Sequence, residues 1–342
     1  MGEQRPRRPR SPRWAKALIA LGVVILLSAS TALVGGQFLA ARYSDSLQRS
    51  TLLGPESRRD APERKALKGP LNYLLVGTDE RSGSKGPGGR SDTIIMVHIP
   101  ASLDRAYLIS VPRDLRVKIP PFPPTGFTGD TSKINAAFPY GGGGTGGVQL
   151  LSETLTRLTG VTFDGAAVID FSGFNRIVTE LGGVRICVDK RVRSVHTGHV
   201  FEAGCQNLTA AEALDYLRQR KTLPGGDFDR QRHQQQFLRA IFSSVFSGGL
   251  ATNPLKLDRV LRAIGSSMTV DLGGVPVDQL AYTLRNIRSD DLTGVRVPAG
   301  ARQIGGTSYV VATADAPGLY RAIRTDTVAT WVRTHPAWVN AL

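Results

Sequence analysis

Short apolar runs that end in charged segments are the feature of this sequence that most restricts its fold. Residues 72–76, 93–98 and 106–111 are apolar runs of strand length, and residues 166–170 and 184–188 are two more. Segments with helical spacing lie between the later runs. Strands that alternate with helices are typical of an α/β domain, in which helices pack on the faces of a sheet. We therefore predict a layered α/β/α domain with a central mixed sheet.

Several helices are marked by their apolar spacing and by residues that favour helix ends. An apolar stripe begins at Val148, and Gly160 ends that helix. Thr209 and Glu212 have the spacing of a capping box, and a longer helix is predicted from Asp229. The pattern weakens in the last third of the chain, but no linker sets that part apart. We therefore predict that it belongs to the same domain.

Residues 17–41 contain no charged residue and are mostly apolar. At a rise of about 1.5 Å per residue, a helix of this length exceeds the roughly 30 Å hydrocarbon core of a bilayer. A cleaved signal peptide is the alternative, with Ser28-Ala29-Ser30 as its cleavage site. Apolar sequence continues beyond that site to Ala41, so we expect an uncleaved transmembrane helix.

The charges that flank this helix predict its orientation. Basic residues are concentrated in the first segment, whereas acidic and basic residues are mixed after the span. An excess of basic residues favours the cytoplasmic side. We therefore predict a single-pass protein of the cell membrane with four parts: a cytoplasmic basic tail (1–16), a transmembrane helix (17–41), an extracytoplasmic linker (42–69) and an extracytoplasmic domain (70–342).

The sequence has two cysteines, Cys187 and Cys205. Outside the cytoplasm, an oxidising environment favours a disulfide between them. A pair of buried free thiols is the alternative. We predict the disulfide.

The net charge of +15 suits a partner that is rich in phosphate. Nucleic acid, anionic lipid headgroups and phosphate polymers all meet that description. No helix-turn-helix pattern is visible in the sequence, and the basic tail is short and rich in proline. We therefore expect no nucleic-acid partner, which argues against a membrane-bound transcriptional regulator.

Charged and amide side chains gather where the apolar runs begin or end. A strand end holds a side chain rigidly and still exposes it to solvent, so such positions suit chemistry. Several arginines, a lysine and a few aspartates fit a phosphate-rich ligand that carries a divalent metal. The candidate residues are Asp79, Arg81, Arg90, Asp92, Arg113, Lys133, Arg218, Arg220, Arg230 and Gln234.

Asp79 and Asp92 are the candidate metal ligands, because two carboxylates at adjacent strand ends can hold Mg²⁺ or Mn²⁺. Arg90 precedes Asp92 by two residues and shares its face if the chain is extended. The structural alternatives are a turn aspartate, a cap aspartate and a surface ion pair with Arg90.

Two further cations follow predicted strands. Pro112 favours an extended chain that directs Arg113 away from the strand tip. Lys133 and Asn135 share a face if the chain is extended there. Solvated loop charges are the alternative for each.

The last candidates lie on the two later helices. Arg218 and Arg220 come at the end of the capped helix, where the helix dipole is an alternative reason for cations. Arg230 and Gln234 are four residues apart and share one helical face. Nearby apolar residues are either the wall of a prenyl tunnel or ordinary core; they are Phe171, Phe174, Phe237, Leu238 and Ile241.

Taken together, these motifs resemble the LytR–CpsA–Psr family in order and spacing. The similarity is strongest over residues 70–250. It rests on the segments 73–81, 90–96, 110–114, 133–136, 182–184, 217–220 and 229–235.

The resemblance implies a phosphotransferase at the outer face of the membrane. Such an enzyme moves a glycopolymer from a polyprenyl-pyrophosphate carrier to a peptidoglycan hydroxyl and forms a phosphodiester. By the same resemblance, Asp79 and Asp92 hold the metal and catalysis depends on these two residues and Arg113. The implied pyrophosphate ligands are Arg81, Arg90, Arg113, Lys133, Arg218, Arg220, Arg230 and Gln234.

One residue departs from the family pattern, and several alternatives stay open. His233 stands where many members have arginine, which implies a weaker grip on phosphate or a different acceptor. A non-catalytic module that binds polyprenyl phosphate or wall polymer is one rival function, and a pyrophosphatase is another. The polymer itself is left open among arabinogalactan, teichoic acid and capsule.

Overall fold

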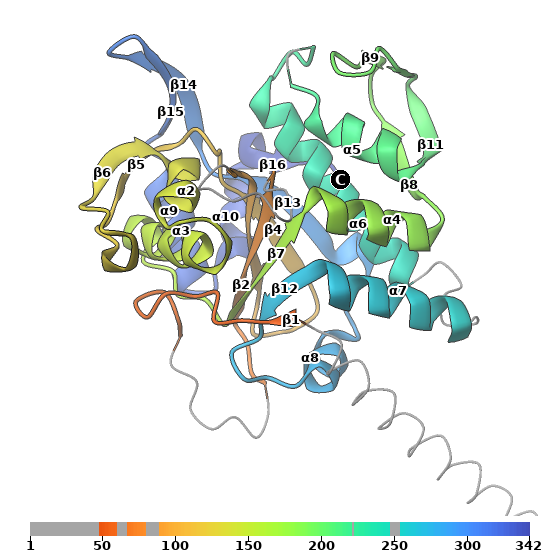
Figure 1. Ribbon diagram of the computed structural model, residues 1–342, viewed down its shortest axis with the longest axis horizontal. Helices are drawn as coiled ribbons and strands as arrows, with labels where there is room; N and C mark the ends of the chain where they lie inside the picture. The colour runs from red at the N-terminus through yellow and green to blue at the C-terminus, as the bar shows by residue number, and fades with distance from the viewer. Residues whose placement is uncertain (1–47, 60–66, 80–88, 221, 247–253) are drawn as a thin grey trace, which may run out of the picture. The chain divides into compact units, whose positions relative to one another are not determined.

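The computed structural model describes residues 48–59, 67–79, 89–220, 222–246 and 254–342. Its centre is a mixed sheet with the strand order β1-β12-β7-β2-β3-β4-β13-β16 (Figure 1). β2 pairs in parallel with β7 and antiparallel with β3, and β4 pairs in parallel with β13. The predicted mixed sheet is confirmed. Its strands are β1 (Gln48–Arg49), β2 (Leu71–Thr78), β3 (Ser91–Ile99), β4 (Ala106–Ser110), β7 (Gly165–Asp170), β12 (Met268–Asp271), β13 (Leu292–Arg296) and β16 (Val339–Asn340).

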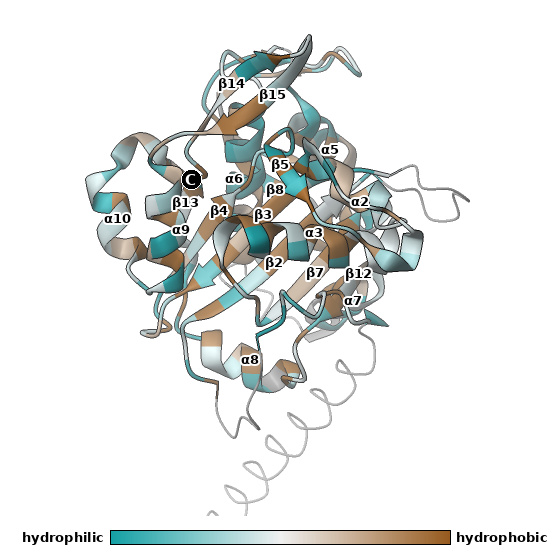
Figure 2. Cartoon of the chain, turned by 90° about the vertical axis from the view of Figure 1, so that its left-hand side faces the viewer, coloured by the Kyte–Doolittle hydropathy of each residue, from teal (hydrophilic) through white to brown (hydrophobic). Residues whose placement is uncertain are grey.

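One face of the sheet packs on α3 (Gly144–Thr159), α9 (Ala316–Arg324) and α10 (Val328–Thr334) (Figure 1). Leu74, Val76 and Met96 of the strands are buried there with residues of these helices. Successive side chains of a strand point to opposite faces, so every second residue joins this core. Much of the central sheet is accordingly apolar in Figure 2.

The other face carries a second group of helices, α4 (Phe171–Leu181), α5 (Ala210–Arg218), α6 (Asp227–Phe246) and α7 (Pro254–Ser267) (Figure 1). Leu75, Ile95 and Ile169 point to this side. Helices thus cover both faces of the sheet. The shorter helices are α2 (Ala137–Tyr140), α8 (Val277–Leu284), η1 (Pro123–Thr125), η2 (Ile134–Ala136), η4 (Ser289–Asp291) and η5 (Pro336–Trp338).

Local sequence signals determine where these helices begin and end. Thr209 and Glu212 form the predicted capping box of α5, and Gly160 ends α3 in the left-handed conformation with φ 69°. The Asp170 carboxylate accepts a hydrogen bond of 2.7 Å from the Gly173 amide and so caps α4. α4 therefore begins directly at the end of β7.

The strand predicted over residues 184–188 exists but does not join the central sheet. β8 (Val184–Val188) pairs with β11 (Gly204–Leu208), beside the short pair β9 (Val192–Arg193) and β10 (Val200–Phe201). The buried residues of β8 pack on α5 and α6. An alternating pattern identifies a half-buried strand, but it does not identify the partner of that strand.

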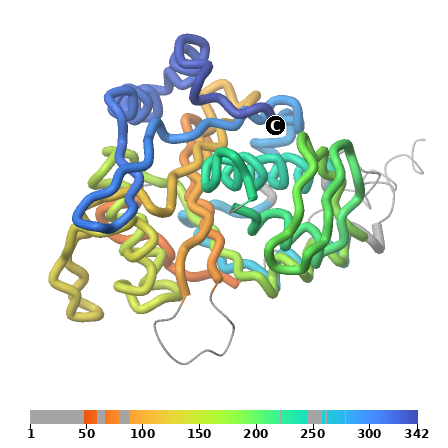
Figure 3. The backbone as a smooth tube through the Cα atoms, turned by 90° about the horizontal axis from the view of Figure 1, so that it is seen from above, coloured from red at the N-terminus to blue at the C-terminus, as the bar shows by residue number. Residues whose placement is uncertain are grey.

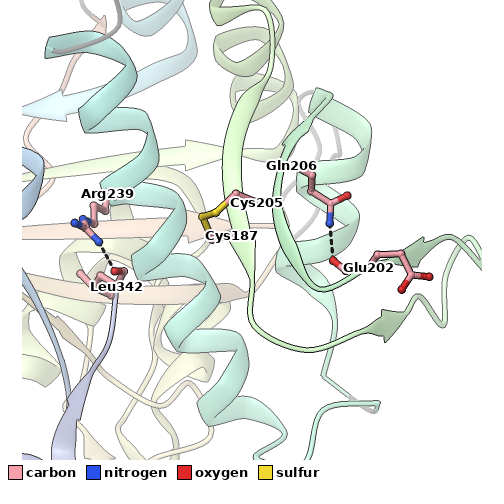
Figure 4. Close-up of a disulfide and its surroundings, with 6 residues drawn as sticks. All are labelled: Cys187, Glu202, Cys205, Gln206, Arg239 and Leu342. Carbon is pink, nitrogen blue, oxygen red and sulfur yellow. Dashed lines mark hydrogen bonds between the residues drawn. A yellow bond between two sulfur atoms is a disulfide. The ribbon is translucent and has the colours of Figure 1, made fainter.

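The predicted disulfide is present in this outer sheet. Cys187 and Cys205 are directly opposite each other on the β8–β11 ladder and are bonded through their sulfur atoms (Figure 4). The bond joins two strands that are already neighbours.

Two hairpins that are separate from the β8–β11 pair also lie outside the central sheet. β5 (Arg116–Ile119) pairs with β6 (Asp130–Lys133), and β14 (Ala299–Ile304) pairs with β15 (Thr307–Ala312). Seen from above, the hairpins lie next to each other (Figure 3). β5 follows β4 along the chain, and β14 follows β13. Because β4 and β13 are parallel neighbours, both hairpins come after the same end of the sheet.

Part of the predicted linker (42–69) is folded into the domain. Leu52 and Leu53 are buried in the main core, and β1 forms the edge of the central sheet. Arg58 of the same segment pairs with Asp271 at 2.6 Å. The domain therefore begins well before residue 70, because an apolar pair inside a polar segment is enough to dock it.

The predicted tail (1–16) and transmembrane helix (17–41) lie outside the described residues. Among the helices that the structure does describe, none is both long and apolar enough to cross a bilayer.

Candidate functional site

A cavity of about 520 Å³ lies between the sheet and helices α4, α5 and α6. Leu75, Ile95 and Ile169 form its wall on the sheet side. Its volume is in the range usual for small-molecule sites. The opposite wall consists of the residues for which the sequence left a tunnel and an ordinary core open; they are Phe171, Phe174, Phe237, Leu238 and Ile241.

Charged residues line the part of the cavity at one edge of the sheet, where β2 and β4 end and β3 begins. Because β3 is antiparallel to β4, its first residues lie beside the end of β4, which Arg113 follows closely. Most of the predicted site residues meet there. The lining includes Asp92, Arg113, Arg218, Arg220, Arg230 and Gln234.

Asp92 occupies a β-bulge. Gly77 pairs with Thr93 and Thr78 pairs with Ser91, so Asp92 is an extra residue without a partner on β2. A bulge bends its strand and redirects the side chain of the extra residue. A local irregularity of the ladder therefore places this carboxylate at the cavity.

Two arginines and two aspartates form one network at this edge. The Asp92 carboxylate forms an ion pair with Arg113, whose Nε lies 3.7 Å from the Asp227 Oδ1. Arg230 pairs with the same Asp227 oxygen at 2.7 Å and donates a hydrogen bond of 3.2 Å to the Asp92 carbonyl. Each arginine is thus held from two directions, as positioning for a ligand requires.

The network affects its two arginines differently. Burial lowers the pKa of Arg230, whose side chain is only 6% exposed, and the Asp227 charge offsets this in part. Burial also acts to lower the pKa of Arg113, but Asp92, Asp227 and Asp114 outweigh it, so the pKa of Arg113 is raised. A ligand with negative charge is the natural complement of guanidinium groups held in a buried place.

Asp227 is absent from the sequence-based site. The predicted helix began at Asp229, whereas α6 begins at Asp227. The sequence signal that could have identified Asp227 is its position three residues before Arg230, because side chains at this spacing meet on a helix.

The positions of Arg218 and Arg220 depend on the residue between them. Gln219 ends α5 in an extended conformation with φ −61° and ψ 134°, so its neighbours point to the opposite side of the chain. Its amide donates hydrogen bonds to the Ser194 hydroxyl at 2.9 Å and to the Asp215 carboxylate at 2.7 Å. Arg218 and Arg220 are left to line the cavity.

The same buried contacts hold the turn between β9 and β10. The Ser194 hydroxyl donates to the Asp215 carboxylate at 2.7 Å, and the Val195 backbone amide donates to the side-chain Oε1 of Gln219 at 3.2 Å. Val195 and His196 of this turn line the cavity next to the arginines. Sequence reasoning missed this part of the wall, because no motif marks it.

Several predicted residues lie outside the cavity lining. Asp79 follows β2, and its carboxylate accepts a hydrogen bond from the Arg90 amide, while the Arg90 side chain is exposed. Lys133 pairs with Asp114 at 3.1 Å, and Asp114 is 3.9 Å from the Nε of Arg113. Arg81 lies outside the described residues.

The condition for Lys133 and Asn135 to share a face, an extended chain between them, is not met. Asn135 is in the short helix η2 and is 6% exposed, so the two side chains do not share a strand face. The chain turns there because Ile134 and Ala137 are drawn into the main core.

His233 takes no part in lining the cavity. Its ring is fully buried and stacks on Tyr216 with 4.3 Å between ring centroids. Burial lowers the pKa of His233 to about 4. His233 is a neutral residue next to Tyr216 in the buried cluster between β8, α5 and α6. The weaker hold on phosphate that was expected from this residue therefore has no basis in a direct contact.

The donor chemistry of two aspartates fits a hard divalent cation. Asp79 and Asp92 lie at neighbouring strand ends, and carboxylate oxygens are preferred ligands of Mg²⁺, which keeps several waters or substrate oxygens. Among the described residues there is no cluster of three or more acidic, histidine or cysteine side chains that could enclose a metal. The pair therefore suits a metal that arrives with a phosphate ligand.

Known proteins resemble this chain over most of its length. The chain is similar to the cell wall biosynthesis protein LcpA of Corynebacterium glutamicum, with 28% identity over 331 residues that cover 86% of this chain and 62% of that protein. It is also similar to TagU of Oceanobacillus iheyensis, named as a polyisoprenyl-teichoic acid–peptidoglycan teichoic acid transferase, with 28% identity over 90% of this chain and 92% of that protein.

A solved structure shares the fold. The crystal structure of Bacillus subtilis TagV has a TM-score of 0.61 and 25% identity, and the match covers 77% of this chain and 98% of that one. The LytR_cpsA_psr family model matches residues 39–320, which include the central sheet from β1 to β13 and every described residue of the cavity. The chain belongs to the LytR–CpsA–Psr family.

Proposed function

We propose that this protein transfers a glycopolymer from a polyprenyl-pyrophosphate carrier to a peptidoglycan hydroxyl and forms a phosphodiester. One observation carries the proposal: a single cavity has arginines at its sheet-edge part and apolar walls elsewhere. A lipid pyrophosphate has the same division into a charged head and an apolar chain. The TagU relative is named as a teichoic acid transferase, which supports the proposal.

The arginines are the groups that bind the pyrophosphate. Arg113 and Arg230 are held in place before a ligand arrives, and Arg218 and Arg220 project from the end of α5. Fixed guanidinium groups stabilise the negative charge that develops on a leaving phosphate. Phosphoryl transfer depends mainly on such positioning and charge neutralisation.

The reaction breaks a phosphoanhydride bond of the pyrophosphate and forms a phosphate ester with the acceptor. The acceptor hydroxyl oxygen attacks the phosphorus that carries the glycopolymer and loses its proton. The bond from that phosphorus to the bridging oxygen breaks, and polyprenyl phosphate leaves with the electron pair. We assign the proton acceptor to no single residue, because Asp79 and Asp92 are poor bases when they hold a metal.

We further propose that Asp79 and Asp92 hold Mg²⁺ or Mn²⁺. When bound, the cation would neutralise charge on the phosphate oxygens. Asp92 also forms an ion pair with Arg113. This carboxylate therefore links the proposed metal site with the arginines that bind the pyrophosphate.

The apolar walls are the proposed place of the prenyl chain. Side chains from the sheet and from α4 and α6 face each other across the cavity. Burial of apolar chain there contributes about 25 cal/mol for each Å² removed from water.

We also propose that residues 17–41 anchor the protein in the cell membrane with the described domain outside. The Cys187–Cys205 disulfide supports this, since disulfides persist in oxidising compartments. A site for a membrane-borne substrate on a membrane-anchored domain is consistent with the proposed reaction.

A transfer assay tests the proposal. The full-length protein in detergent is incubated with a polyprenyl-pyrophosphate oligosaccharide, peptidoglycan fragments and Mg²⁺, and the products are identified by mass spectrometry. Arg113→Ala and Asp92→Ala are compared with Arg321→Ala, an exposed arginine on α9. We expect a phosphodiester-linked product that EDTA abolishes and that both site variants reduce by about 10²-fold or more.

Other outcomes identify the rival functions. Tight lipid binding without any product indicates a carrier module. Release of phosphate without glycan transfer indicates a pyrophosphatase. A product that persists in Arg113→Ala contradicts the proposed site.

A further inference from the structure

A second group of cations lies near Tyr309, on the hairpins β5–β6 and β14–β15. The two hairpins are neighbours in the fold (Figures 1 and 3). We call Arg116, Lys133, Arg302 and Tyr309 the Tyr309 patch. It is formed by β5, β6, β14 and β15, none of which lines the cavity.

Backbone contacts join the patch to the segment that follows Arg113. The Val310 amide donates a hydrogen bond of 2.9 Å to the Asp114 carbonyl, and Leu115 forms a parallel bridge with Val310. Asp114 directly follows Arg113, which lines the cavity. β15 therefore fixes the patch beside the pyrophosphate end of the site.

The cations of the patch face one another across strand ladders. Arg116 and Lys133 are directly opposite on the β5–β6 ladder, and Arg302 is directly opposite Tyr309 on the β14–β15 ladder. The Arg116 guanidinium carbon and the Lys133 ammonium lie 5.8 Å and 5.9 Å from the centre of the Tyr309 ring. Two cations thus lie close to one half-buried aromatic ring, and Arg302 is the cross-strand neighbour of that tyrosine.

The carboxylates nearby do not balance this charge. Asp114 pairs with Lys133 at 3.1 Å. No described carboxylate lies within 4.0 Å of the Arg116 or Arg302 guanidinium nitrogens. Like charges directly opposite on a ladder destabilise a hairpin. An anion between them would remove that cost.

We propose that the Tyr309 patch binds an anionic sugar chain next to the reacting pyrophosphate. Arg116, Arg302 and Lys133 bind its phosphate or carboxylate groups, and the tyrosine offers an apolar ring and a hydroxyl to the sugar. The inference rests on the proposed function for the identity of the ligand. It assigns Lys133 to this sugar chain rather than to the pyrophosphate.

Binding measured without turnover tests this inference. The probes are a fluorescein-labelled poly(ribitol phosphate) oligomer, soluble peptidoglycan fragments that carry free carboxylates, and a neutral chitooligosaccharide. The double variant Arg116→Gln/Arg302→Gln is compared with wild type in the full-length protein, because both side chains are exposed and their loss does not disturb the core. Arg321→Gln is the matched control, and Tyr309→Ala is a second test of the ring.

We expect the double variant to bind one charged probe about tenfold more weakly, with a smaller dependence on salt. Loss for the poly(ribitol phosphate) identifies the donor polymer as the ligand, and loss for the peptidoglycan fragments identifies the acceptor. Neutral oligosaccharide should bind equally to wild type and double variant. Affinities for both charged probes that match those of Arg321→Gln overturn the inference.

The transfer assay keeps this inference separate from the proposed function. If the double variant binds every probe normally while Arg113→Ala abolishes transfer, the proposed role of the Tyr309 patch is wrong and the proposed function stands. If wild-type protein transfers nothing but the double variant loses polymer binding, the patch stands and the proposed function fails.

Discussion

Asp227 holds two of the cavity arginines although it does not line the cavity itself. Its carboxylate pairs with Arg230 at 2.7 Å and lies 3.7 Å from the Arg113 Nε. The Arg230 side chain is 6% exposed, so its charge is shielded from water and depends on such partners. A bound pyrophosphate would supply the same negative charge from the other side.

Asp227→Asn should therefore destabilise the free protein and increase the stabilisation that bound pyrophosphate provides. Removing one partner of a mostly buried pair costs about 3 kcal/mol. We expect a lower Tm for the variant and a larger rise in Tm on addition of inorganic pyrophosphate than wild type shows. Asp290→Asn, which removes an 85% exposed partner of Arg239, is the control. Equal pyrophosphate shifts in Asp227→Asn and wild type would contradict this account of the network.

His233 makes stability depend on pH. Burial lowers its pKa from 6.5 to about 4 in the folded protein, so the unfolded chain binds more protons between these values. Stability is therefore greatest above pH 6.5 and falls as the pH decreases towards 4. The loss from this one group is about 3 kcal/mol at most.

Urea unfolding at pH 7.0 and pH 4.5 tests this dependence. We expect the free energy of unfolding to fall in wild type and to fall less in His233→Phe, which keeps a ring against Tyr216. An equal fall in both proteins would show that His233 is not the group responsible.

At the scale of elements, the end of α5 and the turn between β9 and β10 act as one unit. Gln219 is fully buried and joins Ser194 and Asp215, while its neighbours Arg218 and Arg220 face the cavity. The alternation of an extended chain thus anchors one side and presents cations on the other.

Gln219→Ala should weaken pyrophosphate binding without removing any group that touches the ligand. Arg220 loses its fixed backbone, and we expect Kd for inorganic pyrophosphate to rise about tenfold. Cleavage by protease within residues 194–199 should become faster, because the turn loses its anchor. Gln206→Ala on the neighbouring β11 is the control (Figure 4). If binding weakens equally in Gln206→Ala, the effect is not due to the α5 anchor.

The sequence predicted individual strands and helix caps well, because their signals are local. β2, β3, β4 and β7 lie where apolar runs predict them, and the Thr209 capping box is present. Pairing is not local, so β8 was not expected to leave the central sheet. Similarly, Arg113, Arg218 and Arg230 are marked by charge at element ends.

Other parts of the site depend on interactions that the sequence does not display. The bulge at Asp92 depends on the register between β2 and β3. Gln219 and Asp227 act through buried contacts with residues far away or outside any motif. Lys133 is part of a sequence motif, but it ends β6 and pairs with Asp114 outside the cavity lining.

At the scale of the whole molecule, the segment before residue 60 completes the domain. Leu52 and Leu53 fill the main core, and the Leu52 amide donates to the Asp271 carboxylate at 2.9 Å. The segment therefore stabilises the end of β12, beside the edge strand β1, and does not act as a spacer.

Leu52→Ala tests this boundary. Loss of a fully buried leucine costs about 2–5 kcal/mol through lost burial and a residual cavity. Glu56→Ala in the same segment removes an exposed side chain and should cost less than about 1 kcal/mol. Denaturant unfolding measures both values. Similar small changes in the two variants would mean that this segment is not part of the core.

The central claim is that one cavity binds the pyrophosphate with its arginines and the prenyl chain with its apolar walls. The most direct measurement compares Kd for a polyprenyl pyrophosphate and for inorganic pyrophosphate in wild type, Arg220→Gln and Ile241→Trp. We predict that Arg220→Gln weakens binding of both ligands, whereas Ile241→Trp fills the apolar part and weakens binding of the lipid alone. Lipid affinity that is unchanged in Ile241→Trp would contradict the account.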